Sequence, residues 1–151
     1  MVRGDGWLRA LRRYFVATAV LDLVWEAVQL PLYTIWHEGT TREKAFAVLH
    51  CTAGDPVIAL LALVSALAVA GDPAWPARRA GRVAALTVGG GLAYAVFSEW
   101  LNVEIRRSWA YSGLMPILPP FGTGLSPVLQ WLIVPALALR AAQNAGSDRK
   151  T

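Results

Sequence analysis

Residues 14–36 read YFVATAVLDLVWEAVQLPLYTIW, an apolar run that is long enough to cross a bilayer as a helix. The run is interrupted by Asp22, Glu26, Gln29 and Tyr33, which recur at i, i+4, i+7 and i+11 and so form one polar line on an apolar cylinder. Lipid cannot satisfy such a line, so we expect it to face protein or water inside a bundle. The alternative is that the line only provides polar contacts between helices.

Three further apolar segments follow, and together they explain the composition of the chain. Hydrophobic residues make up 56% of its 151 residues, and the mean hydropathy is +0.43, above the usual level for soluble domains. We therefore predict an all-α polytopic membrane protein, a four-transmembrane-helix bundle that forms one domain over residues 1–151. The expected spans are 14–36, 45–70, 83–105 and 126–142, with a polar tail at 144–151.

The net charge of +4 comes from arginines that cluster outside the apolar segments. They concentrate in 3–13, in 78–82 and near the C-terminus, so the positive-inside rule places both termini in the cytoplasm. This charge therefore indicates membrane topology and no nucleic-acid partner. A cleaved signal peptide is the less favoured interpretation of the N-terminus, because the apolar run continues to Trp36. The only lysines are Lys44 and Lys150, which argues against a Schiff base within a span.

The second span contains a polar group of residues and an apparent break. Thr40 with Glu43 fits a capping box that starts a helix near Thr41. Asp followed by Pro at 55–56 is a helix-start pattern, so we expect a broken helix that lines a cavity. A catalytic or proton-handling cluster and a simple kink both remain open for this group. A metal site is less favoured, because the spacing matches no known ligand pattern, and we expect no cofactor; the residues are His50, Cys51, Thr52 and Asp55.

Residues 98–111, SEWLNVEIRRSWAY, close the third span. Glu99, Asn102 and Arg106 fall at i, i+3 and i+7, so an α-helix would place them on one stripe. We expect Arg106 to turn back toward Glu99, Asn102 or the polar line of the first span. Residues 108–124 are too apolar for a water-facing loop and too rich in Pro and Gly for a helix, which indicates an interfacial or re-entrant segment.

Given cytoplasmic termini, polar residues of all four spans lie at one depth in the outer half of the bilayer. We therefore predict an acid-rich, aromatic-lined pocket there. The candidate catalytic residues are Glu26, His50, Asp55 and Glu99. The candidate substrate-binding residues are Asp22, Gln29, Tyr33, Trp100, Asn102, Arg106, Trp109, Tyr111, Gln130 and Trp131.

Acids that share a dry pocket cannot all ionise cheaply, so at least one should hold a proton and serve as a general acid. Aromatic faces nearby could stabilise a cation, as isomerisation or cyclisation of an isoprenoid or another membrane lipid requires. Arg106 and Arg107 could instead clamp a lipid phosphate. Two alternatives stay open. One is a proton-coupled or ion transporter that works as a homodimer, and the other is a non-catalytic membrane assembly subunit.

Four motifs carry a resemblance to a family of small bacterial multi-pass inner-membrane proteins: 25–33 (WEAVQLPLY), 49–55 (LHCTAGD), 99–111 (EWLN through WAY) and 125–131 (LSPVLQW). The resemblance covers most of the chain. It implies an inner-membrane location and no particular reaction. A fainter likeness to membrane sterol isomerases and cyclases rests only on acids and tryptophans in a small bundle, and no residue role is taken from it.

Overall fold

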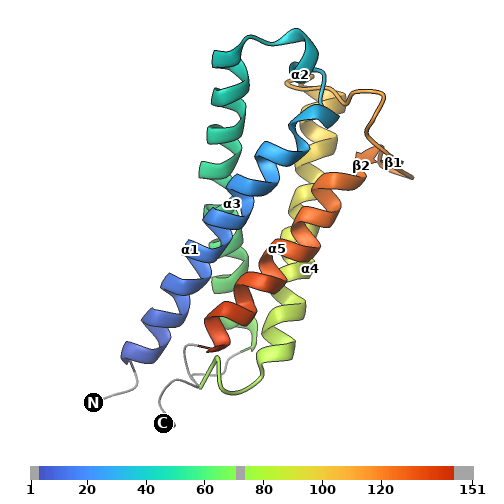
Figure 1. Ribbon diagram of the computed structural model, residues 1–151. Coiled ribbons are helices and arrows are strands. Elements are labelled where there is room, and N and C mark those ends of the chain that lie inside the picture. Colours follow the sequence, from blue (N-terminus) through green and yellow to red (C-terminus); the bar gives the residue numbers. More distant parts are fainter. Residues whose placement is uncertain (1–3, 71–73, 145–151) are drawn as a thin grey trace.

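The computed structural model describes residues 4–70 and 74–144, and four long helices dominate it (Figure 1). They run antiparallel to their neighbours in chain order, and the predicted all-α polytopic bundle is confirmed. The helices are α1 (Gly4–Gln29), α3 (Thr41–Ala70), α4 (Ala80–Glu99) and α5 (Leu125–Asn144).

Each helix of the bundle packs against two others. α1 contacts α3 and α5, and α4 contacts the same two helices, so α1 and α4 lie diagonally across the bundle. α1 begins and α5 ends at one end, which we call the terminal end; the opposite end is the loop end (Figure 1). Side chains that point to the bundle axis can therefore come from all four helices.

The helices have the length and the surface of membrane spans. Four segments are long and apolar enough to cross a bilayer: Gly6–Leu32, Thr41–Ala70, Ala80–Ile105 and Leu125–Asn144. Large apolar side chains are exposed along them, such as Val24 and Val28 on α1 and Leu61 on α3. A contiguous apolar exterior is typical of contact with lipid, so the chain is a multi-pass membrane protein. The expected tail lies largely outside the described residues.

The predicted break in the second span is wrong, because α3 is one continuous helix with Pro56 inside it. Proline removes a single backbone donor, and neighbouring helices commonly compensate for that loss in membrane helices. Pro56 is itself buried. The start of α3 agrees with the prediction, since Thr40 and Glu43 form the capping box through Thr40 N to Glu43 Oε2 at 2.7 Å and Glu43 N to Thr40 Oγ1 at 3.3 Å.

Short irregular segments close the loop end. α1 gives way to a 3₁₀ turn, η1 (Leu30–Leu32), and to α2 (Ile35–Glu38). Residues 108–124 stay at this end, where β1 (Ile117–Leu118) and β2 (Thr123–Gly124) form an antiparallel hairpin, so the segment does not re-enter the bundle (Figure 1). Ser112 connects the segment 108–124 to η1, because its N–H donates to Leu32 O and its hydroxyl donates to Pro31 O.

The apolar core fills the half of the bundle nearer the terminal end. Tyr14, Leu63, Val83 and Leu139 contribute its largest buried side chains, one from each long helix. The Tyr14 hydroxyl donates to Ala59 O at 3.3 Å, which satisfies the polar atom of this aromatic residue. The other half of the bundle is where polar side chains gather.

Gly91 allows a close approach between α4 and α5. A Cβ at this position would lie 2.5 Å from Cε3 and 2.7 Å from Cζ3 of Trp131, whereas a Cβ at Gly90 would meet no atom within 4 Å. We expect Gly91→Ala to lower the free energy of unfolding by about 1–3 kcal/mol through overpacking. Gly90→Ala should be neutral or raise it by up to about 1 kcal/mol, because alanine favours helix. Denaturant unfolding in detergent measures both, and equal effects would contradict the close approach.

Candidate functional site

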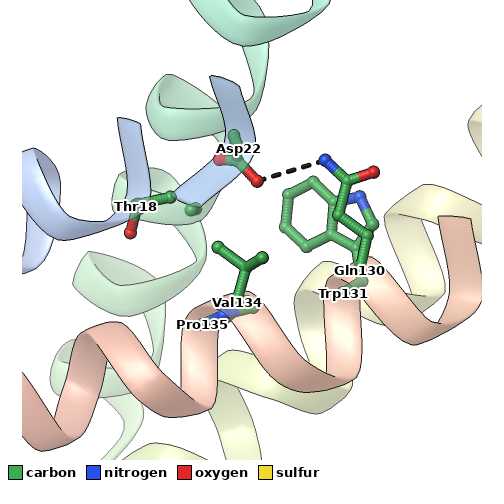
Figure 2. Close-up of a pocket in the computed structure, with 7 residues that line it drawn as sticks. Thr18, Asp22, Gln130, Trp131, Val134 and Pro135 are labelled. Carbon is green, nitrogen blue, oxygen red and sulfur yellow. Dashed lines mark hydrogen bonds between the residues drawn. The ribbon is translucent and has the colours of Figure 1, made fainter. Parts of the chain in front are cut away.

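Five polar side chains from three helices meet around Gln130, and we call them the Gln130 cluster: Asp22, Glu26 and Gln29 on α1, Asp55 on α3, and Gln130 on α5. Gln130 Nε2 lies 3.1 Å from Asp22 Oδ1, 3.1 Å from Glu26 Oε1 and 3.1 Å from Asp55 Oδ2. Figure 2 shows Asp22 and Gln130 facing each other from α1 and α5. An amide has only two N–H hydrogens, so the three carboxyl groups share them.

A second amide extends the Gln130 cluster toward the loop end. Gln29 Nε2 donates to Glu26 Oε1 at 2.8 Å and to Gln130 Oε1 at 3.2 Å. Gln29 Oε1 accepts from the Ser126 hydroxyl at 2.7 Å, and that hydroxyl accepts from the Trp25 indole N–H at 3.2 Å. Both functional groups of Gln29 are therefore bonded, which fixes its orientation and that of Glu26.

Asp22, Glu26 and Asp55 place three carboxyl groups around one amide nitrogen. Three buried carboxyl groups at such close range cannot all be ionised cheaply, because burial and like charge both disfavour the ionised form. Asp22 is 2% exposed and Glu26 8% exposed, so bulk water does not separate the charges. The arrangement of the Gln130 cluster therefore favours a proton on at least one of its acids.

Local sequence explains why these groups converge. Asp22, Glu26 and Gln29 lie on one face of α1 because their spacing follows the helical repeat. Asp55 and Gln130 come from the two helices that flank α1, so that face points at both. Burial of polar groups in such a bundle is tolerated only when they bond to one another, as they do here.

Glu99 and Tyr111 form a second polar group, which we call the outer pair. The Tyr111 hydroxyl donates to Glu99 Oε2 and accepts from Gly124 N at 3.0 Å. Burial, followed by the hydrogen bond to the Glu99 carboxylate, raises the pKa of the Tyr111 phenol, so it remains a donor. Trp109 lies beside Glu99, and its buried indole nitrogen has no hydrogen-bond partner among the described residues.

Tyr33 lies between the Gln130 cluster and the outer pair. Its ring centroid is 5.5 Å from that of Tyr111, and the backbones of the two residues form an isolated antiparallel bridge. Its phenol interacts electrostatically with Glu26 on one side and with Glu99 on the other. Polar groups therefore continue from the middle of the bundle to the loop end.

Four predicted site residues lie apart from both the Gln130 cluster and the outer pair: His50, Trp100, Asn102 and Arg106. His50 is exposed and stacks on Phe46 at 5.4 Å between ring centroids, because five residues place it about 140° around the helix from Asp55. Trp100 is also exposed and packs against Phe97. Asn102 donates to Ser98 O of its own helix at 2.9 Å.

The prediction for Arg106 is wrong, and a change in helix type explains why. α4 continues as a π-helical turn, η2 (Trp100–Ile105), in which hydrogen bonds span five residues rather than four. The added residue per turn rotates Arg106 away from the stripe of Glu99. Its side chain is exposed, and within the described residues it makes no hydrogen bond or ion pair with Glu99, Asn102 or α1.

Ser126 was not among the candidate site residues, although its hydroxyl joins Trp25 to Gln29. The fourth span was expected to begin at residue 126, and α5 begins one residue earlier, at Leu125. Ser126 lies four residues before Gln130 on the same face of α5, and this spacing is the signal that could have added it to the candidate site residues.

The space beside the Gln130 cluster is narrow. Asp22 and Gln130 line it together with Thr18, Ala59, Val134 and Trp131, and it is too small to admit a water molecule (Figure 2). Within residues 4–70 and 74–144, no three His, Cys, Asp or Glu side chains are placed to hold a metal ion. The carboxyl groups of the cluster are close enough to exchange protons with one another, and the amides of Gln29 and Gln130 hold them in place through hydrogen bonds.

Fold and site together define a polytopic helical membrane protein with a buried carboxyl cluster inside its bundle. Comparisons with protein-family models, with curated proteins and with solved structures find no match to this chain.

Proposed function

We propose that this protein is a small membrane enzyme that acts on a lipid or isoprenoid by general acid/base chemistry. The observation that carries the proposal is the convergence of three carboxyl groups, those of Asp22, Glu26 and Asp55, on the amide of Gln130 inside an apolar bundle. Buried acids that share protons are the groups that such catalysis uses. The apolar surroundings suit a substrate that arrives from the bilayer.

An isomerisation would use the cluster as both acid and base. A protonated carboxyl gives its proton to one carbon of a double bond, and a carbocation forms on the adjacent carbon. A carboxylate then removes a proton from the far side of that cation, so the double bond moves and the composition of the lipid is unchanged. Trp25 and Trp131 offer ring faces beside the cluster that stabilise such a cation.

Lipid analysis of a strain that lacks the gene tests this function. We expect one lipid or isoprenoid species to disappear and an isomer of it to accumulate, with recovery when the wild-type gene is returned on a plasmid. An unchanged lipid profile would contradict the enzyme proposal.

Proton-coupled transport is the second candidate, because Tyr33 links the Gln130 cluster to the outer pair at the loop end. Such a transporter would act as a homodimer, since four helices are too few to open a site alternately to the two sides of the membrane. Liposomes with a pH-sensitive dye separate the two candidates. A proton flux that requires Tyr33, with an unchanged lipid profile, favours transport.

We propose further that the chain lies in a bacterial inner membrane with its terminal end in the cytoplasm. The supporting observation is that Arg9, Arg12 and Arg13 on α1 share that end with Arg82 and Arg140. In a Cys51→Ser background, we expect a membrane-impermeant maleimide to label Thr40→Cys in spheroplasts and Ala77→Cys only after lysis. The reverse pattern would invert the topology.

A further inference from the structure

A groove opens to the outside of the bundle between α3 and α4. Its volume is about 360 Å³, within the range of roughly 300–1,000 Å³ that small-molecule sites occupy. None of its lining residues is charged; they include Ile58, Leu86 and Tyr94, and the small residues Ala62, Ser65 and Gly90 leave space between them. Both walls belong to membrane spans, so lipid hydrocarbon has direct access to the groove.

Trp131 packs against the wall of this groove on one side and lines the space beside the Gln130 cluster on the other. Gly91 lies in the groove wall, and the missing side chain there allows the Trp131 indole to pack directly against α4. The same indole lines the narrow space that holds Asp22 and Gln130 (Figure 2). One side chain thus contacts both the wall of the lipid-facing groove and the space that Asp22 and Gln130 line.

Asp22, on the far side of Trp131 from the groove, has a carboxyl oxygen that accepts no hydrogen bond from the described residues. Its side chain is 98% buried, given an exposed fraction of 2%, and its Oδ2 has no hydrogen-bond partner among the described residues. An unpartnered buried acceptor is costly and can be satisfied by a donor from a ligand. Because Glu26 and Asp55 stand beside it, an anionic head group would be repelled there.

We propose that the groove binds the hydrocarbon chain of a neutral lipid alcohol, whose hydroxyl reaches Asp22 Oδ2 when the Trp131 side chain rotates away. The inference rests on the proposed function, for which it names the substrate class and the route of entry. The apolar groove suits the hydrocarbon chain of the lipid, and the Asp22 carboxyl oxygen can accept a hydrogen bond from the lipid hydroxyl. Entry from the bilayer through the groove explains how an apolar substrate reaches the Gln130 cluster, because the space beside the cluster is too small to hold a ligand.

Photo-cross-linking in nanodiscs tests the site with a long-chain primary alcohol that carries a diazirine in its chain, and with the carboxylic acid of the same length. We expect cross-links from the alcohol on groove residues of α3 and α4. Gly90→Leu, which fills the groove, should reduce them about tenfold. Gly89→Leu is the matched control, because Gly89 is equally open but lies outside the groove, and it should leave them unchanged.

The head group is tested by the ratio of alcohol to acid cross-linking. We expect the wild type to favour the alcohol about tenfold, and Asp22→Asn to remove most of that preference. Equal cross-linking of the Gly89→Leu and Gly90→Leu variants, or no preference in the wild type, would overturn the site. A Gly90→Leu variant that instead changes the oligomeric state would show the groove to be a surface between copies.

The test separates this site from the proposed function. If lipid conversion survives Gly90→Leu but depends on the acids of the Gln130 cluster, the enzyme proposal stands and the groove is not its entrance.

Discussion

Gln130→Leu is expected to lower the free energy of unfolding by about 2–4 kcal/mol, the largest stability effect of any single substitution in the cluster. The variant removes the one amide that bonds to carboxyl groups on both α1 and α3, and Asp22 Oδ1 would lose its donor. Leucine has a similar size, so the loss comes from unsatisfied polar groups rather than from a cavity. Unfolding of the purified protein in detergent measures it.

Gln143→Leu is the matched control for this substitution. Gln143 lies on the same helix, and no hydrogen bond joins it to the Gln130 cluster in the described part of the chain. Its replacement should change stability by no more than about 0.5 kcal/mol. Similar losses for the two leucine variants would mean that the amide of Gln130 has no special role in holding the helices together.

Glu26→Gln is expected to reduce lipid conversion by about 100-fold or more while the protein accumulates normally. Glutamine keeps the shape of the side chain and can still bond to Gln29 and Gln130, but it cannot give or take a proton. General acid/base groups commonly contribute 10²–10⁴-fold to a rate, which sets the size of the expected loss. Conversion is measured as recovery of the missing lipid in the deletion strain.

Glu104→Gln controls for the change from an acid to an amide. Glu104 is exposed near the loop end and lies outside the Gln130 cluster, so its variant should retain full conversion. If the Glu26 variant restores the lipid as well as the Glu104 variant does, Glu26 is a structural residue, and the catalytic role must be withdrawn.

The helical repeat is the reason that much of the Gln130 cluster was predictable. Asp22, Glu26 and Gln29 had to share a face once the first span was recognised as a helix, and lipid could not accept that face. Asp55 and Gln130 followed because polar groups in neighbouring spans have few other partners. These inferences depend only on periodicity and on the cost of burying polar groups.

Features that depend on local departures from the α-helix were not predictable in this way. The π-helical turn after Glu99 rotates Arg106 out of register, and nothing in the spacing indicated it. Pro56 was expected to interrupt α3, yet the helix continues. The contact of Glu99 with Tyr111 and that of Gly91 with Trp131 depend on how distant segments pack, which spacing within one helix does not describe.

Infrared spectroscopy of the reconstituted protein tests the central claim, that the acids of the Gln130 cluster hold a proton at neutral pH. We predict a carbonyl-stretch band from a protonated carboxyl at pH 7, which disappears or shifts in Glu26→Gln and in Asp55→Asn but persists in Glu104→Gln. The account is contradicted if the wild type lacks this band at pH 7, with every carboxyl titrating near its ordinary value of about 4.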